Sequence, residues 1–262
     1  MELNSKQFSG SWAVILGGSS GFGLAAVRKL AAHGMNIALL YREMASTEKA
    51  VKQELGQIEN EFDANILSFN LNALSEEGQQ TFLTEFKRLV GVQKCVRLLM
   101  HSIARGNLRP LQELSAQDMR DTTQAMGTSM LDWAKLLLKE DLFQPDARII
   151  GLTSEGTHKY WEGYAAVSVA KAALESLASY MAVDLAPYGI RTNVIQAGVT
   201  DTPSMKKIPG SEELLGHTIT RNPFGRMTGP ADVANVIYLL CTDEASWING
   251  ALIHVDGGEH CR

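Results

Sequence analysis

The sequence predicts an α/β fold in which a doubly wound, parallel, seven-stranded sheet carries helices on both faces. Short aliphatic runs alternate along the chain with longer stretches whose apolar residues recur at helical spacing. The short runs are nearly continuously apolar, which is typical of strands covered on both faces. A glycine-rich turn follows the first run directly. Because strand–helix alternation implies right-handed crossovers, we expect neighbouring strands to be parallel.

Seven runs are predicted to be strands. In chain order they are Trp12–Leu16, Asn36–Tyr41, Asn65–Phe69, Cys95–Met100, Arg148–Leu152, Arg191–Ile195 and Ala251–Val255. Helices are predicted at Phe22–His33, Thr47–Phe62, Glu76–Leu89 and Tyr164–Leu185. Pro230 is predicted to open a further helix, at a position where the missing N–H costs least.

One long segment, Ala197–Gly229, is irregular and rich in Thr, Pro, Gly and Lys. It follows the sixth strand and therefore overhangs the carboxyl edge of the sheet, where ligands bind in parallel sheets. We expect a substrate loop that becomes ordered only when ligands are bound, because its composition supplies few buried contacts. No repeat or hydrophilic linker divides the chain, so residues 1–262 are expected to form one domain.

Composition and charge argue against several classes of function. The net charge of −5 disfavours nucleic acid and anionic membranes as partners, because both need a concentrated positive face. Cys95, Cys241 and Cys261 are too widely spaced for a disulfide framework or a zinc site, which fits a reducing cytoplasm. The N-terminal residues lack the basic start and apolar run of a signal peptide, and no apolar run reaches the length of a membrane span.

The turn after the first strand reads Gly17-Gly18-Ser19-Ser20-Gly21-Phe22-Gly23. Glycines let the chain turn tightly into a helix and bring backbone N–H groups against a pyrophosphate, whose charge the helix N-terminus favours. The alternative is a turn that only permits close helix packing. Because a strand precedes the motif and a helix follows it, the pattern predicts a dinucleotide site on a Rossmann-type sheet.

The end of the second strand indicates which dinucleotide is used. A carboxylate at this position binds the ribose 2′-OH of NAD and repels a 2′-phosphate. The strand ends in Tyr41-Arg42 without a terminal acid, and Arg42 can bind a phosphate through charge-assisted hydrogen bonds. Glu43 follows and offers an alternative, a surface ion pair with Arg42. We predict NADPH (NADP) as the cofactor.

From the glycine loop to Val255-Asp256-Gly257-Gly258, the chain resembles the short-chain dehydrogenase/reductase family. Beside the loop, the resemblance rests on Tyr164 and Lys171 at the start of a helix rich in small residues, and on the strand Arg191-Thr192-Asn193-Val194. It implies an oxidoreductase that uses a nicotinamide cofactor, with Tyr164 and Lys171 in its active site. It also implies a homotetramer assembled through the helix Tyr164–Leu185.

Departures from the common family pattern narrow the resemblance. Six residues separate Tyr164 from Lys171, where most members have three. The segment His101-Ser102-Ile103-Ala104 replaces the usual Asn-Ala-Gly, and Met126 stands where carbonyl-reducing members carry a relay Asn. These features resemble NADPH-dependent enoyl-acyl-carrier-protein reductases. Seven helical steps return to within about 20° of the starting direction, so Tyr164 and Lys171 can both reach one cofactor.

That resemblance implies reduction of the trans-2 double bond of an enoyl thioester on acyl-carrier protein or coenzyme A. It assigns Tyr164 to the thioester carbonyl, where the phenol stabilises an enolate, and Lys171 to the nicotinamide ribose. Ser154 either contacts substrate or cofactor or only caps a turn, and the same alternatives hold for Tyr160. The competing interpretations are a 3-oxoacyl or other carbonyl reductase and, less favoured, a cofactor-binding regulator without catalysis.

Further residues are assigned by their position along the chain. Those expected to contact the cofactor are Gly17, Ser19, Ser20, Gly21, Phe22, Gly23, Arg42, Asn70, Leu71, His101, Ser102, Ile103, Lys171, Gly198, Thr200 and Thr202. Asn70 ends the third strand, where an amide suits an adenine contact or a turn. His101 is expected to be structural rather than a base. Met205, Phe224 and Met227 either line an acyl pocket or seat the loop on the core, and no metal site is predicted.

Overall fold

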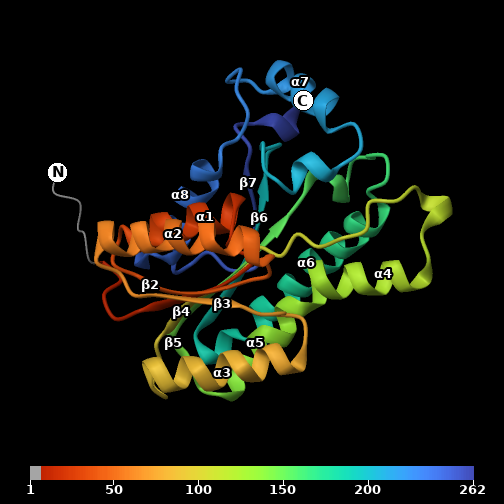
Figure 1. Ribbon diagram of the computed structural model, residues 1–262. Coiled ribbons are helices and arrows are strands. Elements are labelled where there is room, and N and C mark those ends of the chain that lie inside the picture. The colour runs from red at the N-terminus through yellow and green to blue at the C-terminus, as the bar shows by residue number, and fades with distance from the viewer. Residues whose placement is uncertain (1–6) are drawn as a thin grey trace.

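A computed structural model describes residues 7–262 and places seven parallel strands in one sheet, in the order β3-β2-β1-β4-β5-β6-β7 (Figure 1). The strands are β1 (Trp12–Leu16), β2 (Asn36–Tyr41), β3 (Ile66–Asn70), β4 (Val96–His101), β5 (Phe143–Thr153), β6 (Ile190–Ala197) and β7 (Leu252–Val255). Each neighbouring pair is parallel. The predicted Rossmann-type, seven-stranded parallel sheet is therefore confirmed. The prediction for the first six residues lies outside the described part of the chain.

Helices cover both faces of this sheet. They are α1 (Gly21–Ala31), α2 (Ala45–Phe62), α3 (Glu76–Val90), α4 (Ala116–Thr123), α5 (Ser129–Lys139), α6 (Ala165–Asp184), α7 (Ser211–Arg221) and α8 (Pro230–Cys241). Figure 1 shows α1, α2 and α8 on one side of the sheet and α3, α5 and α6 on the other. A π-helical turn, Gln124–Thr128, joins α4 to α5.

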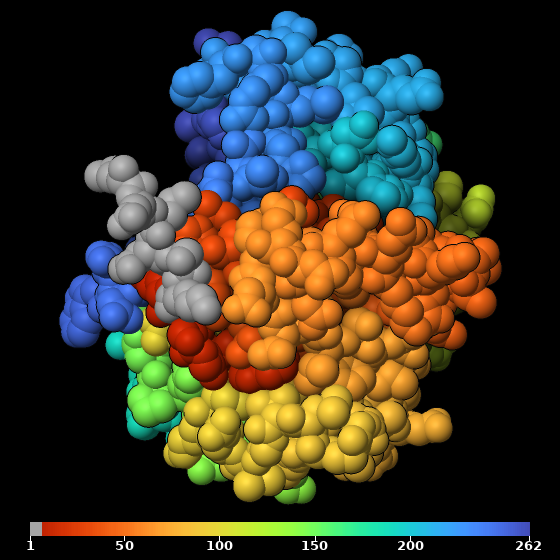
Figure 2. Space-filling model, turned by 60° about the vertical axis from the view of Figure 1, so that its left-hand side comes forward, coloured from red at the N-terminus to blue at the C-terminus, as the bar shows by residue number. Residues whose placement is uncertain are grey.

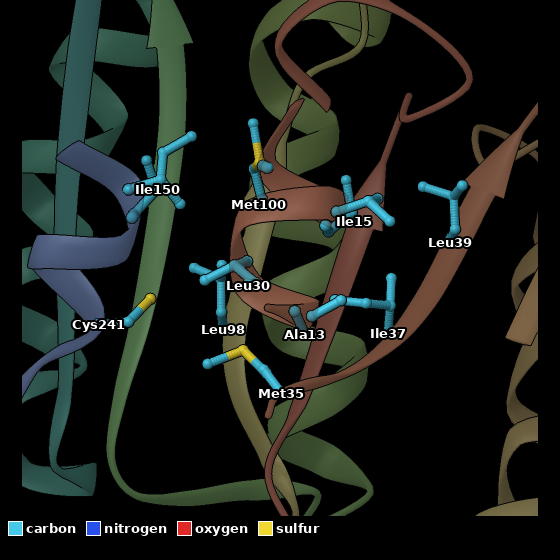
Figure 3. Close-up of a cluster of buried hydrophobic side chains, with 14 of the residues drawn as sticks. Ala13, Ile15, Leu30, Met35, Ile37, Leu39, Leu98, Met100, Ile150 and Cys241 are labelled. Carbon is cyan, nitrogen blue, oxygen red and sulfur yellow. The ribbon is translucent and has the colours of Figure 1, made fainter. Parts of the chain in front are cut away.

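The hydrophobic core has two layers because successive side chains of a strand point to opposite faces of the sheet. In β1, Ala13 and Ile15 join the layer beneath α1 and α8, whereas Val14 and Leu16 join the layer over α3, α5 and α6. Figure 3 shows the first layer, where strand residues meet Leu30 of α1. Full burial of one such aliphatic side chain stabilises the folded protein by about 1.5–3 kcal/mol. The two layers together therefore hold the sheet, and with it the edge on which the site is built, in a fixed position.

The predicted elements are confirmed with small shifts at their ends, except that β5 begins at Phe143 and not at the predicted Arg148, and except in the segment Ala197–Gly229. That segment was expected to be irregular throughout, but it contains the three-turn helix α7. Gly210 precedes α7 in the left-handed region, with φ 71°, and Glu212 and Glu213 occupy its first turn, where acidic side chains complement the helix dipole. The helix buries little of its surface, and Thr218 is its one buried residue. The helix has few buried residues and lies in a segment rich in Thr, Pro, Gly and Lys, which explains why the sequence predicted an irregular segment there.

Helix α6 is the one helix within residues 7–262 that is long and apolar enough to cross a membrane by length and composition alone. Part of that apolar surface is buried inside the protein, and the buried side includes Lys171. The core helix of a soluble protein passes the same test. Its apolar character here follows from packing against the second core layer.

Candidate active site

A cavity of about 780 Å³ opens at the carboxyl edge of the sheet. The turn between β1 and α1 forms one wall, and the ends of β2, β4, β5 and β6 contribute others. Residues within 199–208, which lead toward α7, also line it, and a Cβ on Gly21 would lie 3.4 Å from the Thr202 side chain. Among the predicted site residues, those that line it are Gly17, Ser19, Ser20, Gly21, Phe22, Arg42, Leu71, Ser102, Ile103, Ser154, Tyr164, Lys171, Gly198, Thr200 and Thr202. Residues from eight separate stretches of sequence thus meet in one place.

Two glycines of the loop are required because the backbone of neighbouring segments packs closely against them. A Cβ on Gly17 would lie 2.7 Å from the carbonyl oxygen of Ser102, and Gly17 has φ +85°. A Cβ on Gly23 would lie 2.3 Å from the carbonyl oxygen of Gly17. These contacts fix the tight turn at the N-terminus of α1, and Gly17, Ser19, Ser20 and Gly21 of the same turn line the cavity, at the end of the helix that favours an anion.

The corner beyond β2 holds a cation and a carboxylate side by side. Arg42 is exposed and lines the cavity. Glu43 does not form the ion pair with Arg42 that the sequence offered as an alternative, since its Oε1 accepts a hydrogen bond from Ser19 Oγ at 2.8 Å. Asn70 fixes the Glu43 backbone by accepting from its N–H and donating to its C=O, both at 3.0 Å. The carboxylate is thus held against the glycine loop, next to Arg42.

Tyr164 stands at the N-terminus of α6 with its ring buried in the cavity wall. A side-chain hydrogen bond joins it to Ser154 at the end of β5. Burial raises the pKa of the Tyr164 phenol above its ordinary value, and the Ser154 bond opposes that change. Ser154 Oγ also accepts from the backbone N–H of Gly156 at 3.2 Å, so Ser154 both caps a turn and contacts the site. The phenol is protonated at neutral pH and is available as a hydrogen-bond donor.

Lys171 lies on α6 beside Tyr164 and is buried. Burial lowers the pKa of its ammonium to about 8, and the carboxylate of Glu175, one turn further along α6, opposes this change. Lys171 Nζ donates to the carbonyl oxygen of Met126 at 3.4 Å. Met126 belongs to the π-helical turn and also lines the cavity. Met126 thus contacts Lys171 through its backbone carbonyl.

Three residues predicted to contact the cofactor do not line the cavity. Gly23 faces the glycine loop and lets α1 pack against it. Asn70 is engaged with Glu43, in the turn role that the sequence left open. His101 is fully buried, with Nε2 2.8 Å from Ser129 Oγ, and burial lowers its pKa to about 3. A neutral imidazole in the core agrees with the structural role expected for His101.

The apolar wall of the cavity contains residues that the sequence did not indicate. They are Leu108, Trp161, Val167 and Ile208, together with the predicted Met205. The Trp161 and Tyr164 ring centroids lie 5.1 Å apart. These side chains come from four separate segments, two of them irregular loops, so no periodic pattern in the sequence joins them. The proximity of Trp161 to Tyr164 along the chain was the only available signal.

The remaining aromatic and thioether candidates lie elsewhere. Phe224 is 79% exposed and Tyr160 is 89% exposed, and neither lines the cavity. Met227 is half-buried and also lies outside the lining. Charged residues that the sequence did not indicate do reach the cavity, namely Arg105, Glu155, Lys207 and Glu259. Within residues 7–262 no group of three or more His, Cys, Asp or Glu side chains is arranged to hold a metal ion.

Comparison with known proteins agrees with this arrangement. Residues 17–260 match the family model described as enoyl-(acyl carrier protein) reductase. The enoyl-acyl-carrier-protein reductase (NADH) FabI of Aquifex aeolicus is 40% identical over 112 residues, which cover 43% of this chain and 42% of that enzyme. The 3-oxoacyl-acyl-carrier-protein reductase FabG of the same organism is 26% identical over 96% of this chain and 98% of its own.

A solved structure of one of these relatives has the same fold as this chain. The crystal structure of the Aquifex aeolicus enoyl-acyl-carrier-protein reductase (NADH) superimposes with a TM-score of 0.84 and 26% identity, over 97% of this chain and 99% of that one. The match of the family model covers the glycine loop, the Tyr164–Lys171 pair and the C-terminal turn. The chain is therefore an oxidoreductase that belongs to the short-chain dehydrogenase/reductase family, whose fold binds NAD or NADP.

Proposed function

We propose that this protein reduces the trans-2 double bond of an enoyl thioester, carried by acyl-carrier protein or coenzyme A, with NADPH as the hydride donor. The observation that carries the proposal is the pair Tyr164 and Lys171, separated by six residues and both facing one cavity. The apolar side chains beside Tyr164 suit an acyl chain. Met126 in place of a relay Asn argues against reduction of a ketone.

When bound, the nicotinamide dinucleotide supplies a hydride to the β-carbon of the substrate, and the electron pair of the double bond moves toward the thioester carbonyl. The Tyr164 hydroxyl donates a hydrogen bond to the oxygen on which negative charge develops. The Ser154 hydroxyl holds the Tyr164 hydroxyl in place. A proton taken from solvent water adds to the α-carbon of the enolate and completes the saturated thioester.

Lys171 has a different part in the proposed mechanism. Its ammonium is buried beside Tyr164, where it can donate to the hydroxyls of the nicotinamide ribose and make the protonated phenol a stronger hydrogen-bond donor. The glycine loop, with Ser19 and Ser20, would hold the pyrophosphate, and Arg42 would bind the 2′-phosphate of NADPH. The Glu43 carboxylate beside Arg42 acts against the 2′-phosphate, so the preference depends on which of the two charges prevails.

A second candidate function is the reduction of 3-oxoacyl thioesters. It is favoured by the full-length similarity to a 3-oxoacyl-acyl-carrier-protein reductase. The two functions are separated by presenting the purified protein with trans-2-enoyl and 3-oxoacyl thioesters and following the absorbance of NADPH. We expect turnover of the enoyl thioester only. Efficient turnover of the 3-oxoacyl thioester alone would replace the first proposal by the second.

We further propose that the chain works as one domain, in the cytoplasm, within a homotetramer. The described face of α6 that points away from the core carries apolar side chains at Val169, Tyr180 and Val183. On a helix these three positions lie within an arc of about 60°, so they share one side of α6, with the exposed Ser176 between Val169 and Tyr180. Apolar patches of this kind commonly bind a second subunit.

A further inference from the structure

A buried group of charges joins α7 to the turn that carries Ser154. Arg221, the last residue of α7, donates through Nη2 to Glu155 Oε2 at 2.7 Å and also to Glu259 Oε1. Glu155 follows Ser154 in the turn after β5, and Glu259 lies in the C-terminal turn. Both glutamates are buried and both line the cavity. One guanidinium therefore ties together three segments that are far apart in the sequence.

The charges make this connection strong. Two buried carboxylates converge on Arg221, and Lys159 supplies a second cation to Glu155. Burial raises the pKa of Glu259 above its ordinary value, and Arg221 opposes that change. Loss of Arg221 would leave Glu259 without its cation and Glu155 with Lys159 alone. An uncompensated buried charge is strongly unfavourable, so the surrounding segments are expected to move rather than retain it.

The segments held by Arg221 are those that shape the catalytic face. Glu155 lies between Ser154, which is hydrogen-bonded to Tyr164, and Gly156. A Cβ on Gly156 would lie 2.5 Å from the Tyr164 ring, so this turn packs directly against the phenol. On the other side, the Ser211 N–H donates to Ile208 O at 3.1 Å, which connects α7 to the cavity-lining residues 199–208. Figure 2 shows the cyan and blue chain that contains α7 standing above the orange α2.

We propose that Arg221 is a positioning residue that couples closure of the 199–221 segment over the cavity to the alignment of Ser154 and Tyr164. With the connection formed, α7 is held down and the Ser154 turn is pressed against the Tyr164 ring. With it broken, both become free together. The kinetic part of this inference rests on the proposed role of Tyr164, whereas the effect on α7 does not.

The chain provides a matched control in the same segment. Arg226 pairs with Asp232, but the Arg226 side chain is 62% exposed and the pair lies outside the cavity. Arg221 is 25% exposed and its partner Glu259 is 2% exposed. Exposed ion pairs contribute little to stability, so Arg226→Gln removes a cation of the same kind without disturbing the connection.

The test compares Arg221→Gln, Arg221→Lys and Arg226→Gln in the full chain. We expect Arg221→Gln to increase amide hydrogen exchange in α7 about tenfold or more, with exchange in α2 unchanged. The kcat of Arg221→Gln should fall about 10- to 100-fold, because misplacement of a catalytic group by about 1 Å has effects of that size. Arg221→Lys should recover part of both losses, and Arg226→Gln should match the wild type.

A further variant separates the two halves of the connection and carries the test if Arg221→Gln does not fold. Glu155→Gln should lower kcat while exchange in α7 stays near the wild-type rate, because Glu259 still holds Arg221. Equal behaviour of Arg221→Gln and Arg226→Gln, or loosening of α7 with kcat unchanged, would overturn the coupling. A Tyr164→Phe variant with full activity would instead contradict the proposed role of Tyr164. The hydrogen-exchange result on α7 would remain valid.

Discussion

Tyr164 is the residue whose proposed role can be tested most directly, because the hydroxyl can be removed without loss of the ring. Tyr164→Phe deletes one donor to the developing enolate oxygen, which should cost about 2–4 kcal/mol of transition-state stabilisation and lower kcat by about 30- to 1,000-fold. The Kd for NADPH should stay close to that of the wild type, since the phenylalanine ring fills the same buried space. Steady-state assays with the enoyl thioester measure kcat, and a fluorescence titration measures the Kd for NADPH. Equal losses in kcat and in cofactor binding would assign Tyr164 to the cofactor instead.

Lys171 gives a prediction about pH. Burial lowers the pKa of Lys171 to about 8, so the ammonium is present below that pH and is lost as pH rises through it. We expect NADPH affinity to be constant near neutral pH and to weaken above about pH 8, by up to about tenfold per pH unit. The raised pKa of Tyr164 keeps the phenol protonated across this range. Lys171→Met should bind weakly with no such pH dependence, and a profile that survives in this variant would rule out Lys171 as its source.

The corner beyond β2 predicts how cofactor preference responds to charge. Arg42→Ala should weaken NADPH binding about 10-fold or more with little effect on NADH, because the lost bond is charge-assisted. Glu43→Gln should change the ratio in the opposite direction, toward NADPH, because it removes the carboxylate that Ser19 holds beside Arg42. The ratio of kcat/KM for NADPH to that for NADH, measured for the wild type and both variants, tests this prediction. A preference of the wild type for NADH would show that the Glu43 carboxylate prevails.

Among single residues, the sequence predicted those whose role depends on neighbours along the chain. The glycine loop and the Tyr164–Lys171 pair are local patterns, and both line the cavity. The hydrogen bond from Ser19 to Glu43 joins residues that are 24 positions apart, and that from Arg221 to Glu155 joins residues 66 apart. Tertiary packing creates such contacts, so no spacing in the sequence reveals them.

At the scale of secondary structure, the close contact between α6 and the π-helical turn positions Lys171. A Cβ on Gly127 would lie 2.7 Å from the carbonyl oxygen of Ala170, the residue before Lys171. Gly127→Ala should therefore push α6 away, destabilise the protein by about 1–3 kcal/mol and weaken cofactor binding. Denaturant unfolding and cofactor titration measure both effects.

Gly56 is the control for this prediction. It lies inside α2, and a Cβ there would meet nothing within 4 Å. Gly56→Ala should stabilise the protein by about 0.5–1 kcal/mol, because alanine favours a helix over glycine. If the two variants changed stability equally, the contact between Gly127 and α6 would not be what holds that helix in place.

Among the secondary-structure elements, α7 shows where pattern reading fails. Helices α6 and α8 are recognised by their strongly apolar composition, whereas α7 is mixed in composition, buries one residue and is stabilised by its acidic first turn and by Arg221. The contact from Arg221 to a carboxylate 66 positions away is not visible in any local pattern. The expectation that this segment orders only with ligands remains a prediction, and the Arg221 connection supplies a physical reason for partial order without them.

At the scale of the whole molecule, the fold was the most predictable property. Seven apolar runs with helical stretches between them leave few arrangements that bury both faces of every strand, and right-handed crossovers reduce them further without fixing the strand order. The two layers of the core follow from the alternation of side chains in β1 and β4. How the chain assembles with copies of itself depends on exposed side chains, which the sequence pattern constrains only weakly.

Assembly can be tested at the exposed apolar residues of α6. Tyr180 and Val183 are 70% and 71% exposed, and apolar residues of this kind are expected to be buried between subunits. Tyr180→Glu places a charge at the centre of the proposed contact, and the desolvation of that charge should shift the molar mass in light scattering from four chains to fewer. Leu89→Glu, on α3, changes a comparably apolar exposed residue on another helix and should leave the mass unchanged. A wild-type protein with the mass of one chain would disprove the proposed tetramer. A charge disrupts assembly only where the partner subunit covers it, so dissociation by Leu89→Glu alone would place the interface on α3.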